Sequence, residues 1–520
     1  MSDAQNTTAE PEKREEFSGQ LGFILSAIGS AVGLGNIWRF PGVAYENGGG
    51  AFMVPYLIAL LTAGIPILFL DYAIGHRFRG SAPLAFRRVK RWLEGLGWFQ
   101  VAICFVIAVY YAVIIAWALS YFVYSFDLRW GDDTAGFFTG TYLQLADVGG
   151  ADPWFTLDFV PAVLIPLVLV WVATIVVLAA GVAKGLEKVN FVFMPLLLLA
   201  FGTLVVRALF LPGAADGLNA LFTPNWGAMA DPNVWIAAYS QIFFSLSIAF
   251  GIMITYASYR KRRANLTSPG FVVAFANSGF EVFAGIGVFA ALGFLAHEQG
   301  VAVAELEGLT GPILAFVTFP ALVSQMPAGG LFGALFFGSL VMAGYTSLLS
   351  ILQVVSASFQ EKFGWTRTQA SVRIGVVSAV LSVLAFSTTT GLIALDTVDQ
   401  WANNIGIVTS AVITTVVMGW VLRRTEEMRY HLNAVSTIRV GRWWTFCVVV
   451  LGPVVLTSML VSRIVSLIQD GYEGYAEAYL AAAGWGTVVL LVVAAAVLTS
   501  MRWRVEPDRF DVWPRFGGKS

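Results

Sequence analysis

The feature that most constrains the fold is a series of apolar stretches, each roughly twenty residues long or longer. A helix rises about 1.5 Å per residue, so about twenty apolar residues cross the hydrocarbon core of a bilayer. Strands of a membrane barrel need only about ten residues of alternating polarity. The lengths therefore predict an all-α membrane protein with twelve spans, at about 18–45, 51–77, 97–126, 158–181, 189–211, 234–259, 268–296, 329–360, 370–387, 397–422, 442–467 and 480–501.

Composition agrees with a lipid environment. Hydrophobic residues make up 58% of the chain and charged residues only 12%, whereas about a quarter of the residues in a soluble domain are charged. The net charge of −1 gives no indication of a nucleic-acid partner. Cys104 and Cys447 both lie in apolar runs, so we interpret them as buried apolar side chains rather than as a disulfide.

Basic residues indicate the orientation in the membrane. By position, 27 of the 31 Lys and Arg residues fall in alternate loops and tails on one side of the predicted spans. Loops rich in Lys and Arg face the cytoplasm, so both termini are predicted to be cytoplasmic. The polar segment 1–17 lacks the pattern of a signal peptide. It is predicted to be a cytoplasmic tail, as is 504–520.

One loop on the opposite side, 297–328, carries apolar residues of its own. It could form a short helical lid over the outer mouth, or it could be an ordinary surface loop. The three histidines, His76, His297 and His431, are expected in loops.

The first span contains an unusual density of glycine. Gly29, Gly33 and Gly35 occur within seven residues, and each glycine costs a helix about 1 kcal/mol relative to alanine. Close helix packing is one explanation, because small residues four apart pack against neighbouring helices. A break in the helix is the other, and the polar residues Asn36 and Arg39 favour it, since polar groups inside the bilayer usually face a cavity.

The sixth span has a similar polar centre, in which Gln241, Ser245 and Ser247 lie at mid-membrane depth. Two interrupted spans in corresponding positions indicate two inverted repeats with a binding site between them. We therefore predict one domain over 18–503, with repeats of five spans at about 18–211 and 234–422 and two extra spans at about 442–501.

The residues around the first break resemble a known family. The run AVGLGNIWRFP at 31–41, followed by ENGGGAF at 46–52, is similar to the signature of the neurotransmitter:sodium symporters, and within that family to the bacterial leucine transporter branch. Further similarity lies at 110–111, 243–247, Asn277 and 343–347. The resemblance implies the leucine-transporter fold in a prokaryotic cell membrane. It also implies sodium-driven import of an amino acid by alternating access, with no enzymatic activity.

The resemblance implies two sodium sites built from uncharged oxygen atoms. The first would use the carbonyl of Ala31 and the side chains of Asn36, Ser245 and Asn277, together with the substrate carboxylate. The second would use the carbonyls of Gly29, Val32 and Ala343 with the hydroxyls of Thr346 and Ser347. Ordinary hydrogen bonding between helices is the alternative for these side chains.

The resemblance also implies how a zwitterion would bind. Its carboxylate would accept hydrogen bonds from the amides of Leu34 and Gly35 and from Tyr111, beside Ala31, and its ammonium would face Ser247. Gly33 stands where monoamine carriers have an aspartate, so an amino acid fits better. The side-chain pocket would be lined by Ile107, Phe244, Ile248, Ala249, Phe250, Ser347 and Ile351. No charged residue is among them, so we expect a neutral, aliphatic or hydrophobic substrate.

Three further features follow from the resemblance. Glu281 would supply the negative charge that chloride provides in other members, near Tyr56 and Gln241, so no chloride is expected. A proton-carrying or merely paired glutamate is the alternative. The outer gate would pair Arg39 with Asp399. The inner gate would pair Arg14 with Glu361.

Two alternatives belong to other classes of function. A channel or a non-transporting amino-acid sensor could use the same fold. A membrane enzyme is disfavoured, because the sequence contains no metal-ligand spacing, no Ser/His/Asp arrangement and no nucleotide-binding loop. The sequence does not define an oligomeric state.

Overall fold

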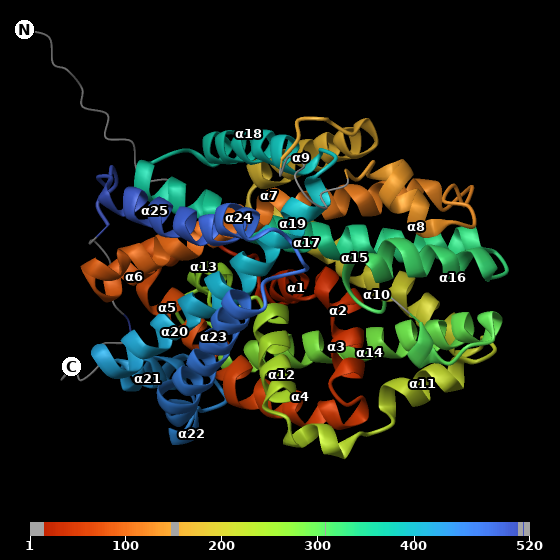
Figure 1. The fold of residues 1–520 in the computed structure, drawn as a ribbon. Helices are drawn as coiled ribbons and strands as arrows, with labels where there is room; N and C mark the ends of the chain where they lie inside the picture. The colour runs from red at the N-terminus through yellow and green to blue at the C-terminus, as the bar shows by residue number, and fades with distance from the viewer. Residues whose placement is uncertain (1–14, 147–154, 307, 508–512, 514–520) are drawn as a thin grey trace, which may run out of the picture.

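The computed structural model describes residues 15–146, 155–306, 308–507 and 513. The described chain is helical almost throughout and forms two isolated β-bridges, Gly49 with Pro224 and Phe159 with Thr388. Figure 1 shows long helices packed side by side around α1 and α2, which lie near the centre of the view.

Within the described residues, ten continuous helical segments are long and apolar enough to cross a bilayer. Apolar length is what selects them, as the sequence predicts. They are Gly50–Phe78 (with α4 and α5), Arg91–Tyr124 (α7), Pro161–Ala180 (α9), Val182–Leu209 (α10), Thr267–Gln299 (α14), Gly329–Phe363 (α17), Arg367–Phe386 (α18), Gly391–Val421 (α19 and α20), Arg442–Gln469 (α22 and α23) and Glu477–Ser500 (α24 and α25).

The first span is broken at mid-length. Its first half is α1 (Gln20–Ala31), and its second half is α2 (Leu34–Trp38) with α3 (Phe40–Glu46). The two halves meet at an angle of 55°. Val32 (ψ 98°) and Gly33 (φ −128°, ψ −164°) adopt extended backbone between them. The break predicted from the glycines is therefore confirmed.

The sixth span is broken as well, between α12 (Pro232–Ser245) and α13 (Ile252–Ser258). The six linking residues include Ser247, Ala249 and Gly251 with φ of 53°, 66° and 91°. Left-handed backbone is unfavourable for residues with a β-carbon, so this link keeps its shape only because neighbouring spans hold it. Counted with the ten continuous segments, the two broken spans give the twelve that were predicted. The grouping into two five-span repeats stays a prediction.

The apolar outer loop is helical, as one of the two predicted alternatives requires. It forms α15 (Gly311–Ile313), a wide π-type turn at Leu314–Thr318, and α16 (Phe319–Gln325). Phe316 in the turn packs edge-on against Trp38 of α2, with ring centroids 6.3 Å apart. The loop thus covers the outer half of the broken first span.

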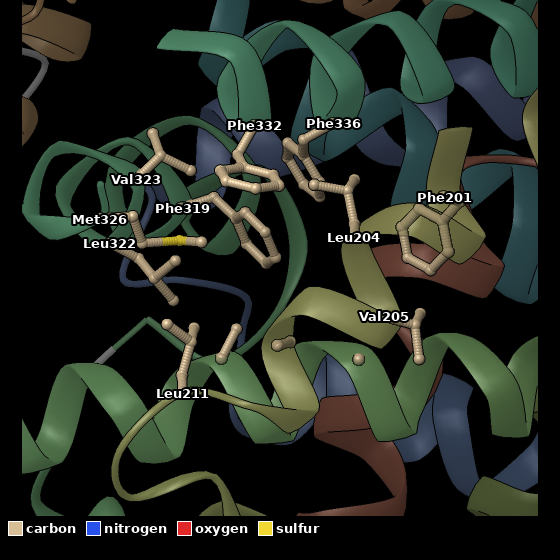
Figure 2. A pocket seen from close by; sticks show the side chains of 13 residues that line it. Phe201, Leu204, Val205, Leu211, Phe319, Leu322, Val323, Met326, Phe332 and Phe336 are labelled. Atoms are coloured by element: carbon tan, nitrogen blue, oxygen red, sulfur yellow. The ribbon is translucent and has the colours of Figure 1, made fainter. Parts of the chain in front are cut away.

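A small cavity of about 20 Å³ lies behind this loop, between α10, α14, α16 and α17. Figure 2 shows the side chains that surround it, among them Phe319, Phe332, Phe336 and Met326. All of its lining residues are apolar. A zwitterion has no partner there, so the binding site has to be sought elsewhere.

The histidines do not lie in loops, and that prediction is wrong. His76 is in the last turn of α5 (Ile65–Phe78), His297 is near the end of α14, and His431 is in the short helix α21 (Thr425–Val435). His76 Nδ1 and His431 Nε2 are 2.9 Å apart, and both side chains are buried. Helices here extend beyond the apolar stretches, because polar residues can continue a helix past the membrane surface.

The described start of the carboxy-terminal tail packs on the protein. Trp503 Nε1 donates a hydrogen bond of 2.8 Å to Glu94, the first residue of α7 (Glu94–Tyr124). Glu94 also pairs with Lys362 of α17 and with Arg87, both at 2.7 Å. Both side chains of the Lys362 pair are almost completely buried, so this network fixes the tail to the ends of α7 and α17.

Candidate functional site

A polar cavity of about 60 Å³ lies where the two breaks meet. Its walls come from the first, third, sixth, eighth and tenth spans. Broken helices expose backbone groups that have no partner within the helix, and such groups line binding sites in the middle of a membrane. The cavity is therefore the candidate functional site.

Four of the residues predicted for the first sodium site lie together at the break. Asn36 Nδ2 donates to Asn277 Oδ1 (2.8 Å), and Asn277 Nδ2 donates to Ser245 Oγ (3.0 Å). Asn36 Oδ1 accepts from the amide of Gly33 (2.9 Å). Ala31 lines the same cavity. This chain of contacts joins the first, seventh and sixth spans, and it concentrates uncharged oxygen atoms of the kind that sodium prefers.

The residues predicted for the second sodium site also converge. Ser347 Oγ lies 3.3 Å from the Gly29 carbonyl and 3.2 Å from the Ala343 carbonyl. Thr346 Oγ1 lies 3.0 Å from the same Ala343 carbonyl. Val32 is the first residue after α1 and is buried. Two hydroxyls therefore approach the carbonyls with which the resemblance groups them.

Of the residues predicted to hold the substrate carboxylate, Leu34 and Gly35 lie at the start of α2 and Tyr111 lies in α7. The amide of Leu34 donates to Tyr111 Oη at 3.3 Å. A β-carbon on Gly33 would lie 3.0 Å from Tyr111 Oη and from Ser347 Oγ. Gly33 thus keeps open the space between the break, the third span and the eighth span.

The link in the sixth span is held by contacts that the sequence analysis did not anticipate. Asp71 Oδ2 in α5 accepts from the amide of Ala249 (2.9 Å). Ser410 in α20 (Val408–Val416) donates to the Ala249 carbonyl (2.6 Å), and Cys104 Sγ lies 3.0 Å from the Phe250 carbonyl. Asp71 is completely buried. The sequence could have pointed to Asp71, because a carboxylate inside an apolar stretch usually has a specific partner or function.

These contacts change the composition of the side-chain pocket. Ile107, Phe244, Phe250, Ser347 and Ile351 line the cavity as expected, and so does Ser247. Ile248 and Ala249 do not line it and are completely buried. The reason is the left-handed backbone of the link, which directs the peptide groups of Ala249 to Asp71 and Ser410.

Ser247 makes a contact across the two breaks. Its hydroxyl donates to the carbonyl of Ser30 at 2.9 Å. The sixth-span link is thus joined directly to the last turn of α1, at the place where the ammonium group was expected.

Glu281 lies in the middle of α14 and is completely buried. Tyr56 donates a hydrogen bond to its carboxylate, and Gln241 Nε2 donates another at 2.7 Å. The three residues that were grouped around a missing chloride are therefore in contact. The two side-chain donors partly offset the cost of burying this carboxylate.

Of the predicted outer gate, Asp399 lines the cavity, and Arg39 lies beside the cavity residue Phe244. The described ion pairs do not include one between Arg39 and Asp399. The guanidinium of Arg39 lies over the ring of Phe244, 4.6 Å from its centroid. Asp399 Oδ1 instead accepts from Tyr110 (2.6 Å) and Asn403 (2.7 Å).

Asn403 is a cavity residue that the sequence analysis missed. It lies in a wide π-type turn at Ala402–Ile407, within the tenth span. Such turns are frequent at functional sites. Its amide donates to Tyr110 (3.2 Å) as well as to Asp399, so it fixes the Asp399 carboxylate at the cavity wall.

We expect Asn403→Ala to raise the substrate concentration for half-maximal binding about fivefold, because a hydrogen bond to a charged group stabilises by about 1 kcal/mol or more. Equilibrium binding to the purified protein measures the change. The control is Asn404→Ala, whose amide contacts Gln400 (2.9 Å) instead. Equal binding by the two variants would contradict the role given to Asn403.

Only half of the predicted inner gate can be described. Arg14 lies outside the described residues. Glu361 accepts from the amide (2.9 Å) and hydroxyl (2.5 Å) of Ser81. Phe17 packs edge-on against Tyr256 and Tyr259, with centroids 5.5 and 6.2 Å apart, so aromatic rings pack together beside α13.

Two broken spans around a polar cavity are the arrangement of a membrane transporter of the discontinuous-helix type. A sequence model described as the sodium:neurotransmitter symporter family matches residues 14–146 and 131–506. The chain therefore belongs to the sodium:neurotransmitter symporter family.

Individual relatives agree. The chain is 38% identical over 499 residues to an uncharacterized sodium-dependent transporter of Methanocaldococcus jannaschii, covering 94% of this chain and 98% of the relative. It is 30% identical to the human sodium- and chloride-dependent creatine transporter 1, over 87% of this chain and 77% of the relative. Its structure is similar to that of MhsT in complex with L-phenylalanine, with a TM-score of 0.73, 32% identity, and coverage of 86% and 100%.

Proposed function

We propose that this protein imports a neutral, hydrophobic or aliphatic amino acid together with sodium, by alternating access and without chloride. The observation that carries the proposal is the polar cavity at the two breaks, where uncharged oxygen atoms gather beside the apolar side chains of Ile107, Phe250 and Ile351. The L-phenylalanine bound to MhsT supports an amino-acid substrate. The similar creatine transporter is sodium- and chloride-dependent, so the chloride requirement of this chain has to be tested directly.

In the proposed site, one sodium ion is held by Asn36, Ser245, Asn277 and the Ala31 carbonyl. The other is held by Thr346, Ser347 and the carbonyls of Gly29, Val32 and Ala343. The substrate carboxylate lies against Leu34, Gly35 and Tyr111. The side chain of the substrate points toward Ile107, Phe250 and Ile351, which offer no charge to pair with an ionised side chain.

Two sodium ions supply enough energy for accumulation. Each positive charge that enters at 100 mV contributes about 2.3 kcal/mol. Two ions then contribute about 4.6 kcal/mol from voltage alone, which corresponds to roughly a thousandfold gradient. A neutral zwitterion gains nothing from the voltage itself.

The proposed topology places both termini in the cytoplasm of a prokaryotic cell. The outer gate is then Arg39 with Asp399, closing over Phe244 and Tyr111. The inner gate is Arg14 with Glu361, beside the aromatic closure around Phe17. Two closures in series are what alternating access requires, and a channel needs only one.

The test is uptake of labelled amino acids by proteoliposomes under an imposed sodium gradient, with and without chloride. We expect concentrative, sodium-dependent uptake of aliphatic or hydrophobic amino acids that is unchanged when gluconate replaces chloride. Equal uptake in sodium-free buffer with a proton gradient would disprove sodium coupling. Flux without accumulation would indicate a channel, and binding without flux would indicate a sensor.

A further inference from the structure

A second polar pocket lies at the Lys- and Arg-rich end of the molecule, separate from the central cavity. Its volume is about 350 Å³. One wall is formed by 17–20, just before and at the start of α1, and the other by residues of the segment 259–264 that follows α13. It shares no lining residue with the central cavity.

Three cations line this pocket, namely Arg260, Lys261 and Arg263. None of them belongs to an ion pair in the described part of the chain. One carboxylate approaches the wall, because Glu187 accepts hydrogen bonds from the amide (3.0 Å) and hydroxyl of Ser18. Three like charges without a paired acid attract an anion into the space between them.

Arg260 is the buried member of the three, with only 6% of its surface exposed. Its Nη1 donates to the Gly19 carbonyl (3.2 Å), and its guanidinium lies 4.8 Å from the ring centroid of Phe23. Among the described residues, nothing accepts a hydrogen bond from its Nε. A buried donor left without an acceptor costs stability, so an anion in the pocket would supply what this side chain lacks.

Burial lowers the pKa of Arg260 from its ordinary value, and the nearby Tyr72 partly offsets the effect. A bound anion would favour the charged guanidinium and reverse the shift.

The cations are presented by a backbone that other elements hold in place. Arg79 donates to the Arg260 carbonyl, and His76 Nε2 lies 2.8 Å from the Lys261 carbonyl. The amide of Ala264 donates to the same Lys261 carbonyl at 2.9 Å, which closes a turn. These hydrogen bonds fix the backbone of the segment, so its basic residues are held at the pocket.

We propose that this pocket binds a phosphate group, carried either by an anionic phospholipid or by a free phosphate ion. Guanidinium and ammonium donors match the oxygen atoms of phosphate. Leu21 adjoins the pocket residue Gln20 and is 58% exposed, which offers apolar surface to an acyl chain. Basic clusters at the cytoplasmic face attract anionic headgroups in the same way.

A phosphate in this pocket would contact both broken spans, through Gly19 and Gln20 on one side and through Arg260 and Lys261 on the other. The same two segments already meet through Phe17 and Tyr259. The ligand therefore stabilises the closed arrangement of this end. This role does not depend on which solute the central cavity carries.

The experiment uses the full-length protein in nanodiscs of phosphatidylcholine, of phosphatidylcholine with phosphatidylglycerol, and of phosphatidylcholine with added inorganic phosphate. Binding of each anion is followed by native mass spectrometry and by the rise in melting temperature. The variant Lys261→Gln/Arg263→Gln removes two exposed cations of the pocket, so it leaves the buried contacts of Arg260 intact. The matched control is Lys184→Gln/Lys188→Gln, two exposed cations at the start of the Val182–Leu209 helical segment, which do not line the pocket.

We expect the pocket variant to lose about fivefold or more in anion affinity relative to the wild type and the control, since each basic residue near a charged surface contributes measurably to binding. Arg260→Gln should lose at least as much. Selective binding in the phosphatidylglycerol discs supports a lipid headgroup, and binding of inorganic phosphate alone supports the free ion. Equal losses in the pocket variant and the control, or no binding of either anion by the wild type, would overturn the proposal.

Discussion

In chloride-free buffer, we expect Glu281→Ser to reduce sodium-driven uptake at least about a hundredfold, and we expect added chloride to restore most of it. Removing a buried charge from a compensated site costs roughly 3 kcal/mol or more, which corresponds to more than a hundredfold. Serine leaves the donors Tyr56 and Gln241 in place and opens space at the position of the carboxylate. Chloride can then take over the negative charge that faces the sodium ions.

Two further variants distinguish the loss of the Glu281 charge from other effects of a substitution. Glu281→Gln removes the charge but keeps the size of the side chain. It leaves no space for a chloride ion, so added chloride should restore little of its uptake. Glu298→Ser changes an exposed glutamate of the same helix, α14, and should transport like the wild type without chloride. Chloride-independent transport by Glu281→Ser would show that the carboxylate does not replace an anion, and the proton-carrying alternative would then be favoured.

The spans could be predicted because their cause is local. Apolar length defines a span, and a cluster of glycines with polar neighbours marks a place where a helix is costly. Gly33 and Asn36 therefore gave the first break from the sequence alone. The sixth break was less obvious, since Ser247 and Ala249 adopt left-handed backbone for which neither residue type has a preference.

The contacts that hold the sixth break could not be predicted from that segment. Asp71, Cys104 and Ser410 reach it from the second, third and tenth spans, and only tertiary packing brings them together. Cys104 was interpreted as a buried apolar side chain, which its burial agrees with, but its sulfur also approaches the Phe250 carbonyl. A polar residue inside an apolar span can be recognised in the sequence as functionally or structurally important. The group that it contacts is determined by tertiary packing and cannot be recognised there.

Asn403 shows the same limit of sequence-based prediction at the proposed outer gate. The gate residues Arg39 and Asp399 carry charge and stand out in an apolar sequence. Asn403 looks like any amide in a span, and its place on the cavity depends on a locally widened turn. Asn403 there donates a hydrogen bond to Asp399, four residues earlier.

Asn36→Ala should raise the sodium concentration for half-maximal uptake at least about tenfold, because losing one oxygen ligand and leaving its neighbours unpaired costs about 1–3 kcal/mol. The effect is large since this side chain does two things at once. Its oxygen caps the Gly33 amide at the break, and its nitrogen orients Asn277 toward Ser245. Sodium titration of uptake in proteoliposomes measures the shift.

The second proposed sodium site gives an independent comparison. Thr346→Ala removes a hydroxyl near the Ala343 carbonyl without touching the Asn36 network, so it should also raise the sodium requirement while the binding of sodium at the first site persists. Asn404→Ala removes an amide of the tenth span that does not line the cavity and should leave the sodium dependence unchanged. If Asn36→Ala and Thr346→Ala both kept the wild-type sodium dependence, uncharged oxygen atoms at the breaks would be hydrogen-bonding partners of the helices and not ligands of sodium.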